Sequence, residues 1–158
     1  MRVGLYIPVL LILSLAVIGG ALIFQYAVGL VPCELCLYER WPWYAAIVVL
    51  VALLVARPSA LVPWTPLLLG LLFVASSALG IYHVGVEQHI FPGPDACTGP
   101  ALHGQTIEEL TRQLLSTPAV RCDEPQWSLF GVSLAGWNVV ASLMAVLLCF
   151  RAWQRTWR

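Results

Sequence analysis

Long apolar runs dominate the chain and set the class of structure that it can form. A helix needs roughly 20 predominantly apolar residues to cross the hydrocarbon core of a bilayer. Only 10% of the 158 residues are charged, against about a quarter in an average soluble domain. The sequence therefore predicts an all-α integral membrane protein, a bundle of four transmembrane helices in a single domain covering residues 1–158. The predicted spans lie at about 5–28, 34–56, 61–82 and 129–150.

The second run is the least regular of the four. Its uninterrupted apolar part, 41–56, rises only about 24 Å as a helix, less than the roughly 30 Å of the hydrocarbon core. We therefore expect the helix to begin near Cys33 or Cys36, with Pro42 either bending or restarting it. The first run is expected to be a retained span, because its apolar stretch exceeds the roughly 7–15 residues of a signal peptide.

Charged residues separate cleanly between the two sides of the predicted membrane. One side receives Arg and no acidic residue, and the other receives three Arg with all eight carboxylates. By the positive-inside rule the first side is cytoplasmic, so both termini lie inside and two loops, at about 29–40 and 83–128, lie outside. A net charge of zero gives a nucleic-acid partner no electrostatic support. The Arg of the inner side are Arg2, Arg57, Arg151, Arg155 and Arg158.

The second outer loop contains a pattern typical of a helix start. Residues 106–109, Thr-Ile-Glu-Glu, match a capping box, and Ile107, Leu110 and Leu114 then recur at helical spacing before Pro118. We expect a short amphipathic helix here. It lies on the membrane surface or is an ordinary solvated helix, and the pattern fits both.

Four of the five cysteines fall in the outer loops, where an oxidising compartment lets disulfides persist. Cys33 and Cys36 form a C-x-x-C pair at the mouth of the second helix, and Cys97 and Cys122 lie in the second loop. A helix N-terminus favours the thiolate, which is the form that attacks disulfides. The fifth, Cys149, falls at the inner end of the last span and is expected to be a packing residue.

Two charged neighbours bear on the first pair. Arg40 follows Cys36 by four residues and so shares its helical face. We expect its positive charge to stabilise a Cys36 thiolate or an anion bound beside it, while Glu34 and Glu39 oppose this effect.

Three interpretations fit the four outer cysteines: a redox relay, structural disulfides, or a zinc site. A disulfide that closes a four-residue loop contributes little stability, because the benefit grows with loop length. The pair also lies at the membrane interface, where a lipid-soluble oxidant can reach it. Zinc is the least favoured, since the spacing lacks the usual paired knuckles, and we expect no metal. Redox chemistry is favoured over structural disulfides.

Two polar residues in the predicted spans are weaker candidates. His83 falls at the outer end of the third span, where it is either an interfacial side chain whose polar tip reaches water or a polar contact to a cofactor. Asn138 falls inside the fourth span, where such residues usually form hydrogen bonds between helices.

These features together resemble the disulfide bond formation protein B (DsbB) family. The resemblance is carried by residues 32–40, Pro-Cys-Glu-Leu-Cys-Leu-Tyr-Glu-Arg, by 92–97, Pro-Gly-Pro-Asp-Ala-Cys, and by 122–127, Cys-Asp-Glu-Pro-Gln-Trp. It covers nearly the whole chain in topology. Glu34 departs from the pattern, because an apolar residue is more familiar inside the pair, and Pro42 is a second departure.

The resemblance implies a quinone-linked oxidase of a DsbA-like periplasmic thioredoxin-fold protein in the bacterial inner membrane. Cys97 would form a mixed disulfide with that partner, and electrons would pass from Cys97 and Cys122 to Cys33 and Cys36. Cys36 would deliver them to ubiquinone or menaquinone, with Arg40 stabilising the developing negative charge. The alternatives are a scaffolding membrane protein with inert disulfides, and a paralogue that serves a dedicated partner.

Overall fold

The computed structural model describes residues 5–56, 64–94, 106–116 and 121–156. Several residues on which the sequence predictions depend fall outside these ranges: Arg2, Arg57, 61–63, Cys97, Pro118 and Arg158. The helices are α1 (Tyr6–Tyr26), α2 (Glu34–Ala56), α3 (Thr65–Glu87), α5 (Ile107–Ser116) and α6 (Leu134–Thr156). The strands, which pair antiparallel, are β1 (Ser128–Leu129) and β2 (Val132–Ser133).

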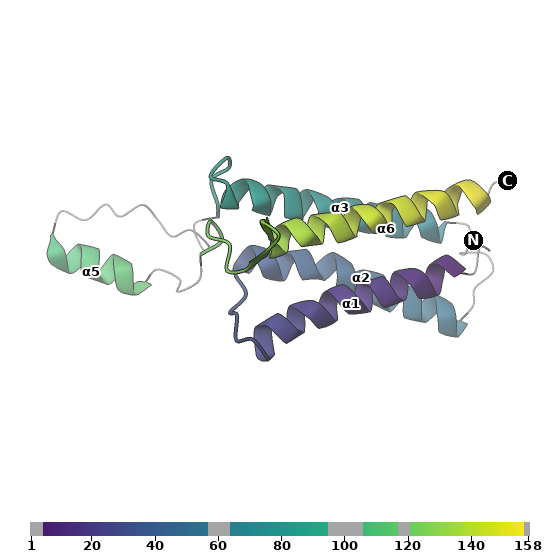
Figure 1. Ribbon diagram of the computed structural model, residues 1–158, viewed down its shortest axis with the longest axis horizontal. Helices are drawn as coiled ribbons and strands as arrows, with labels where there is room; N and C mark the ends of the chain where they lie inside the picture. Colours follow the sequence, from purple (N-terminus) through teal and green to yellow (C-terminus); the bar gives the residue numbers. More distant parts are fainter. Residues whose placement is uncertain (1–4, 57–63, 95–105, 117–120, 157–158) are drawn as a thin grey trace.

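Helices α1, α2, α3 and α6 are each long and apolar enough to cross a membrane. They run side by side (Figure 1), and each packs against two neighbours in the cyclic order α1, α2, α3, α6. Large apolar side chains remain exposed on their outer faces, as contact with lipid requires. The prediction of an all-α, four-helix membrane bundle is confirmed. Examples of such exposed side chains are Ile12, Val48, Leu71 and Leu147.

The interface between α3 and α6 shows how the bundle holds together where lipid removes the hydrophobic driving force between helices. Such interfaces depend on small residues and on hydrogen bonds between helices. The buried Ser142 hydroxyl donates to the Ser76 hydroxyl at 2.9 Å. Gly80 lets the two backbones approach, since a Cβ built there would lie 2.7 Å from Cγ2 of Val139. Close packing at Gly80 is therefore a requirement of this fold.

Gly80→Ala is expected to destabilise the bundle. Overpacking of a filled interior typically costs about 1–3 kcal/mol. Gly19→Ala is the matched control, because a Cβ at Gly19 meets nothing within 4 Å and both variants gain the same helix propensity. In thermal or denaturant unfolding in detergent, Gly80→Ala should be about 1–3 kcal/mol less stable than Gly19→Ala. Equal stability of the two variants would contradict this packing.

The last membrane-spanning helix, α6, begins later than the sequence indicated. The fourth span was predicted from 129, but residues 128–133 form the β1–β2 hairpin. Its two turn residues, Phe130 and Gly131, have φ of 53° and 77°, the positive values that a tight two-residue hairpin turn needs. The Ser133 hydroxyl then accepts a hydrogen bond from the Gly136 N–H at 3.1 Å and so caps α6.

Helix α3 continues past the predicted end at residue 82 and reaches Glu87. The Ser133 hydroxyl donates to the Glu87 carboxylate at 2.5 Å, which ties the end of α3 to the start of α6. In α2, Pro42 lies inside a continuous helix. The helix begins directly after Cys33, which agrees with one of the two starts that the sequence predicted. It does not restart at Pro42.

Helix α5 forms between α3 and α6, where the capping box predicted it. The Glu109 N–H donates to the Thr106 hydroxyl at 3.3 Å, which is the N-cap half of that pattern. Figure 1 shows α5 standing apart from the four-helix bundle. Ile107 and Leu115 are both exposed.

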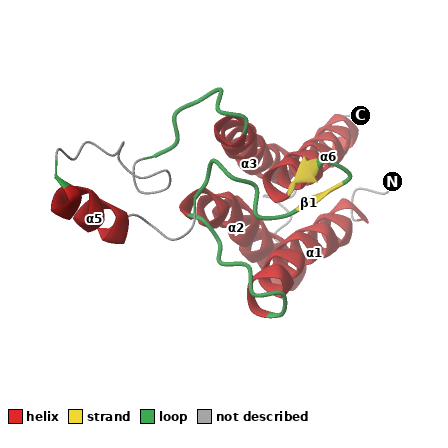
Figure 2. Cartoon of the chain, turned by 60° about the vertical axis from the view of Figure 1, so that its left-hand side comes forward, coloured by secondary structure: helices red, strands yellow, loops and turns green. Residues whose placement is uncertain are grey.

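The thiols of the described residues divide between the two ends of the bundle. Figure 2 looks toward the end that carries segments 27–33, 88–94 and 121–133, and Cys33, Cys36 and Cys122 belong to this end. Cys149 lies toward the other end of α6, buried in the main apolar core, and is a packing residue as predicted. We call the first of these the thiol end.

Candidate functional site at the thiol end

The first cysteine pair is shaped by the start of α2. Cys33 directly precedes the helix and Cys36 lies in its first turn. The Cys36 backbone N–H donates to Cys33 Sγ at 3.3 Å, which uses one of the N–H groups that a helix start leaves without a partner. The two sulfur atoms are 2.7 Å apart, and both cysteines are free.

These contacts favour the thiolate of Cys33. Hydrogen bonds from the Cys36 thiol and from the Cys36 N–H lower the pKa of Cys33, although burial and the Glu39 carboxylate act in the opposite direction. The thiolate is the nucleophile in disulfide exchange. Cys33 is therefore the cysteine of the pair that is better prepared to exchange with another sulfur.

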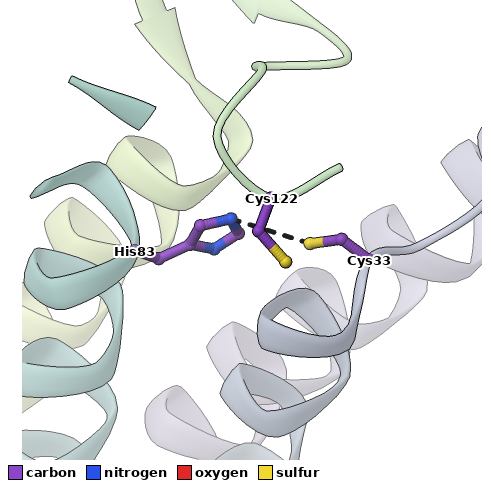
Figure 3. A group of neighbouring side chains, drawn as sticks. All are labelled: Cys33, His83 and Cys122. Atoms are coloured by element: carbon purple, nitrogen blue, oxygen red, sulfur yellow. Dashed lines mark hydrogen bonds between the residues drawn. The ribbon is translucent and has the colours of Figure 1, made fainter. Parts of the chain in front are cut away.

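Cys122 lies beside this pair although it is 89 positions further along the chain. Its segment is held against α1 by Trp127, which packs on Phe24 with ring centroids 4.6 Å apart. Within the segment, the Arg121 guanidinium binds the Asp123 carboxylate. The Cys122 side chain is only 1% exposed and is disulfide-bonded. The Sγ atoms of Cys33 and Cys122 lie within 4.8 Å of each other (Figure 3).

His83 faces the same cluster from α3, as Figure 3 shows. Its side chain is 3% exposed, so the interpretation of an interfacial side chain that reaches water is wrong. Nδ1 lies 2.7 Å from Oε1 of Glu39, and Nε2 lies 3.6 Å from Cys33 Sγ. Because a carboxylate only accepts hydrogen bonds, Glu39 favours the proton on Nδ1 and leaves Nε2 as an acceptor toward Cys33.

A cavity of about 250 Å³ opens next to the cluster, between α1, α2 and α6. Small residues of α1, among them Ala16, Gly20 and Ala21, leave the space open, and a Cβ added at Gly20 would meet nothing within 4 Å. Its walls are mostly apolar, while Cys36 and His83 line its polar end. A cavity of about 150 Å³ already accepts benzene, so this one is large enough for a substituted ring.

Polar groups from three helices face this cavity. The Arg40 guanidinium donates to Gln25 Oε1 of α1 at 2.6 Å, and both residues line the cavity. Asn138 of α6 accepts a hydrogen bond from Trp43 Nε1 at 2.8 Å, as expected for a residue that joins helices. Its buried Nδ2 faces the Glu39 carboxylate but makes no hydrogen bond of good geometry with the described residues. A buried N–H that lacks a well-placed acceptor is costly, so Nδ2 is available to donate to an acceptor that enters the cavity.

The family model of the disulfide bond formation protein DsbB matches residues 5–152. The chain belongs to the DsbB family. Two relatives are named disulfide bond formation protein B: that of Haemophilus influenzae (strain ATCC 51907) is 33% identical, covering 85% of this chain and 77% of the relative, and that of Actinobacillus pleuropneumoniae is 28% identical, covering 90% and 83%. An uncharacterized protein of Rickettsia prowazekii is 26% identical, covering 88% and 81%. No solved structure matches significantly.

Membership of the DsbB family gives the thiol end a general function. With four membrane-spanning helices and cysteines gathered at one end, the chain is a multi-pass membrane protein of disulfide bond formation. Its relatives imply a thiol oxidoreductase with redox-active cysteines. This favours the redox interpretation of the cysteines over inert structural disulfides.

Most residues of this DsbB-family site were predicted from the sequence. Cys33, Cys36, Cys122, Arg40 and His83 all lie at the thiol end, while Cys97 lies outside the described residues.

The importance of Glu39 was not predicted from the sequence. Glu39 is 7% exposed and binds His83, whereas Glu34 accepts a hydrogen bond from Tyr38 on the exposed side at 2.7 Å. An ionisable residue inside an apolar helix was the available signal, since such residues are expensive in a membrane and usually functional.

Proposed function

We propose that this chain reoxidises a periplasmic, DsbA-like thioredoxin-fold dithiol protein and passes the electrons to a membrane quinone. One observation carries the proposal: Cys33 lies between a disulfide-bonded sulfur, that of Cys122, and a thiol that lines an apolar cavity, that of Cys36. Sulfur atoms in this order form a chain along which disulfides can exchange. The name of the Haemophilus influenzae relative supports the same direction of chemistry.

The exchange steps balance along this chain of sulfurs, with Cys97 as the proposed bonding partner of Cys122. A thiolate of the reduced partner attacks Cys97, and the Cys122 thiolate leaves. Cys122 then attacks Cys33 of an oxidised first pair, and the Cys36 thiolate leaves at the cavity. The partner's second thiolate displaces Cys97, the partner departs oxidised, and Cys97 attacks Cys122 to release Cys33. Each attack forms one S–S bond and breaks one.

His83 and Glu39 supply the proton handling for Cys33. His83 Nε2, 3.6 Å from Cys33 Sγ, can accept the proton when the Cys33 thiol becomes a thiolate. It can return a proton when the Cys33 thiolate is released. The Glu39 carboxylate stabilises the resulting imidazolium through Nδ1, in the way that a buried carboxylate orients an imidazole in other enzymes. His83 is thus proposed as a base beside the thiol pair.

The cavity residues fit a quinone headgroup. Ring and tail need apolar walls, and the ring's carbonyl oxygens need donors. Arg40 offers a charged donor, and Asn138 Nδ2 offers a donor that makes no hydrogen bond of good geometry within the described chain. When bound, a quinone accepts two electrons and two protons. Ubiquinone and menaquinone both meet these requirements.

We place the thiol end on the periplasmic side of the bacterial inner membrane and both termini in the cytoplasm. In a chain whose native cysteines are replaced by serine, Ile107→Cys should react with an impermeant maleimide in intact spheroplasts. Gln154→Cys, an exposed position at the other end of α6, should react only after permeabilisation. The reverse pattern would overturn the orientation.

Quinone reduction by the purified protein tests the proposed function. The protein in detergent is mixed with a reduced thioredoxin-fold dithiol protein and a soluble quinone analogue, and quinone absorbance is followed. Sustained turnover that needs all three components is expected. Partner oxidation limited to one equivalent per chain, with no quinone consumed, would support a scaffold with slowly exchanging disulfides instead. A paralogue with a dedicated partner would oxidise one such dithiol protein and not others.

A further inference from the structure

We propose that Cys33, His83 and Cys122 form a Zn²⁺ site when both cysteine pairs are reduced, and that the bound ion holds the thiols inactive. One sulfur of each cysteine and one ring nitrogen of His83 all lie within 4.8 Å of one another, and all three residues are buried (Figure 3). The ligand atoms of a tetrahedral zinc ion lie about 3.5–3.8 Å apart, given bonds of about 2.3 Å to sulfur and 2.0 Å to nitrogen. Cys33 Sγ and His83 Nε2, at 3.6 Å, already have this separation.

The second observation is the orientation of His83. A histidine that binds a metal nearly always donates its other ring N–H to a carboxylate or carbonyl, which fixes the ring and its tautomer. His83 has this arrangement before any metal arrives, because Nδ1 lies 2.7 Å from the buried Glu39 carboxylate. The nitrogen left with a lone pair is Nε2, which points to the thiols. Glu39 is therefore the positioning residue of the site.

The Cys36 backbone N–H adds support from the first pair. Its hydrogen bond to Cys33 Sγ stabilises negative charge on that sulfur, as zinc thiolates require. The Cys36 side chain, which neighbours Cys33, or a water molecule can take the fourth position. Zinc is a borderline-soft ion that prefers sulfur and nitrogen ligands, and this site offers both.

The oxidation state of the cysteines controls the site. Cys122 is disulfide-bonded in the structure, so only reduction of that bond frees its sulfur for a metal. Binding then displaces the protons of two thiols and changes no oxidation state. Because the ion would occupy the two sulfurs that exchange in the proposed relay, it acts as an inhibitor of the reduced chain and not as a cofactor. Binding itself needs neither quinone nor partner, so it stands apart from the proposed function.

Metal titration of the reduced protein tests this site. The full chain in detergent is reduced anaerobically with a phosphine, freed of reductant, and titrated with Cd²⁺ while the sulfur-to-metal charge-transfer absorbance is followed. Competition with a coloured chelator gives the Zn²⁺ affinity. One ion per chain is expected for the reduced protein and none for the protein with both pairs oxidised. Equal binding to both forms would show an adventitious site and overturn the proposal.

Variants identify the ligands. Cys149→Ser should bind as the wild type does. Glu39→Gln keeps all ligands but should weaken Zn²⁺ binding by about 10–100-fold, the usual effect of losing such a partner. Cys122→Ser and His83→Ala each remove a ligand and should weaken Zn²⁺ binding by about as much as Glu39→Gln or more. Circular dichroism checks that both variants are folded. Wild-type affinity in both of these would place the metal on Cys33 and Cys36 alone, and the proposed site would be wrong.

Discussion

Serine in place of Cys33, Cys36, Cys97 or Cys122 is expected to abolish the proposed quinone-linked turnover, whereas Cys149→Ser should leave it unchanged. The reason is that in the proposed relay the electron pair crosses two cysteine pairs in series, so exchange should stop when any one sulfur is missing. Cys149 is buried in the apolar core and takes no part. The measurement is quinone consumption with excess reduced partner.

Single-turnover experiments separate the roles of the two pairs. Cys33→Ser and Cys36→Ser retain the second pair and should oxidise one equivalent of partner before stopping, while Cys97→Ser and Cys122→Ser should oxidise none through that pair. With a single-cysteine partner presented as an activated mixed disulfide, Cys122→Ser should retain a covalent complex through Cys97. Sustained turnover in Cys33→Ser or Cys36→Ser would remove the first pair from the pathway.

Arg40→Ala should weaken the apparent quinone affinity or the rate of quinone reduction by roughly 10- to 150-fold. A hydrogen bond to a charged group contributes about 1.5–3 kcal/mol, and each 1.4 kcal/mol or so is tenfold. Excess quinone should restore part of the rate, while oxidation of the partner in a single turnover stays at the wild-type level. Quinone titrations at fixed partner concentration measure both effects.

Two further variants show what part of Arg40 matters. Gln25→Ala removes the acceptor of the Arg40 hydrogen bond but keeps the charge, so a smaller loss of about 2- to 12-fold is expected, as for a neutral contact of 0.5–1.5 kcal/mol. Arg151→Ala, at the far end of α6, should have no effect. If a folded Arg40→Ala protein keeps the wild-type quinone dependence, Arg40 only anchors the helix and takes no part in binding.

Local sequence determined much of this protein because the forces involved act over a few residues. A run of about 20 apolar residues commits the backbone to a helix in lipid, so all four spans were predictable, as were the start of α2 near Cys33 and the cap of α5 at Thr106. The first cysteine pair was equally visible, since its two sulfurs are separated by a single helical turn. The β1–β2 hairpin was missed because Ser128–Ser133 continues the apolar run without a strong strand signal.

Only the tertiary structure decided how the site is assembled. Glu39 and His83 are 44 positions apart, and Cys33 and Cys122 meet through a loop that Phe24 holds at Trp127. The cavity exists because small residues of α1 line the space beside Cys36 of α2. Sequence periodicity gives the lipid-facing or inward direction of each residue but not which inward residues meet. Which inward residues meet is determined by the order and rotation of the helices, and these depend on contacts such as that of Gly80 with Val139.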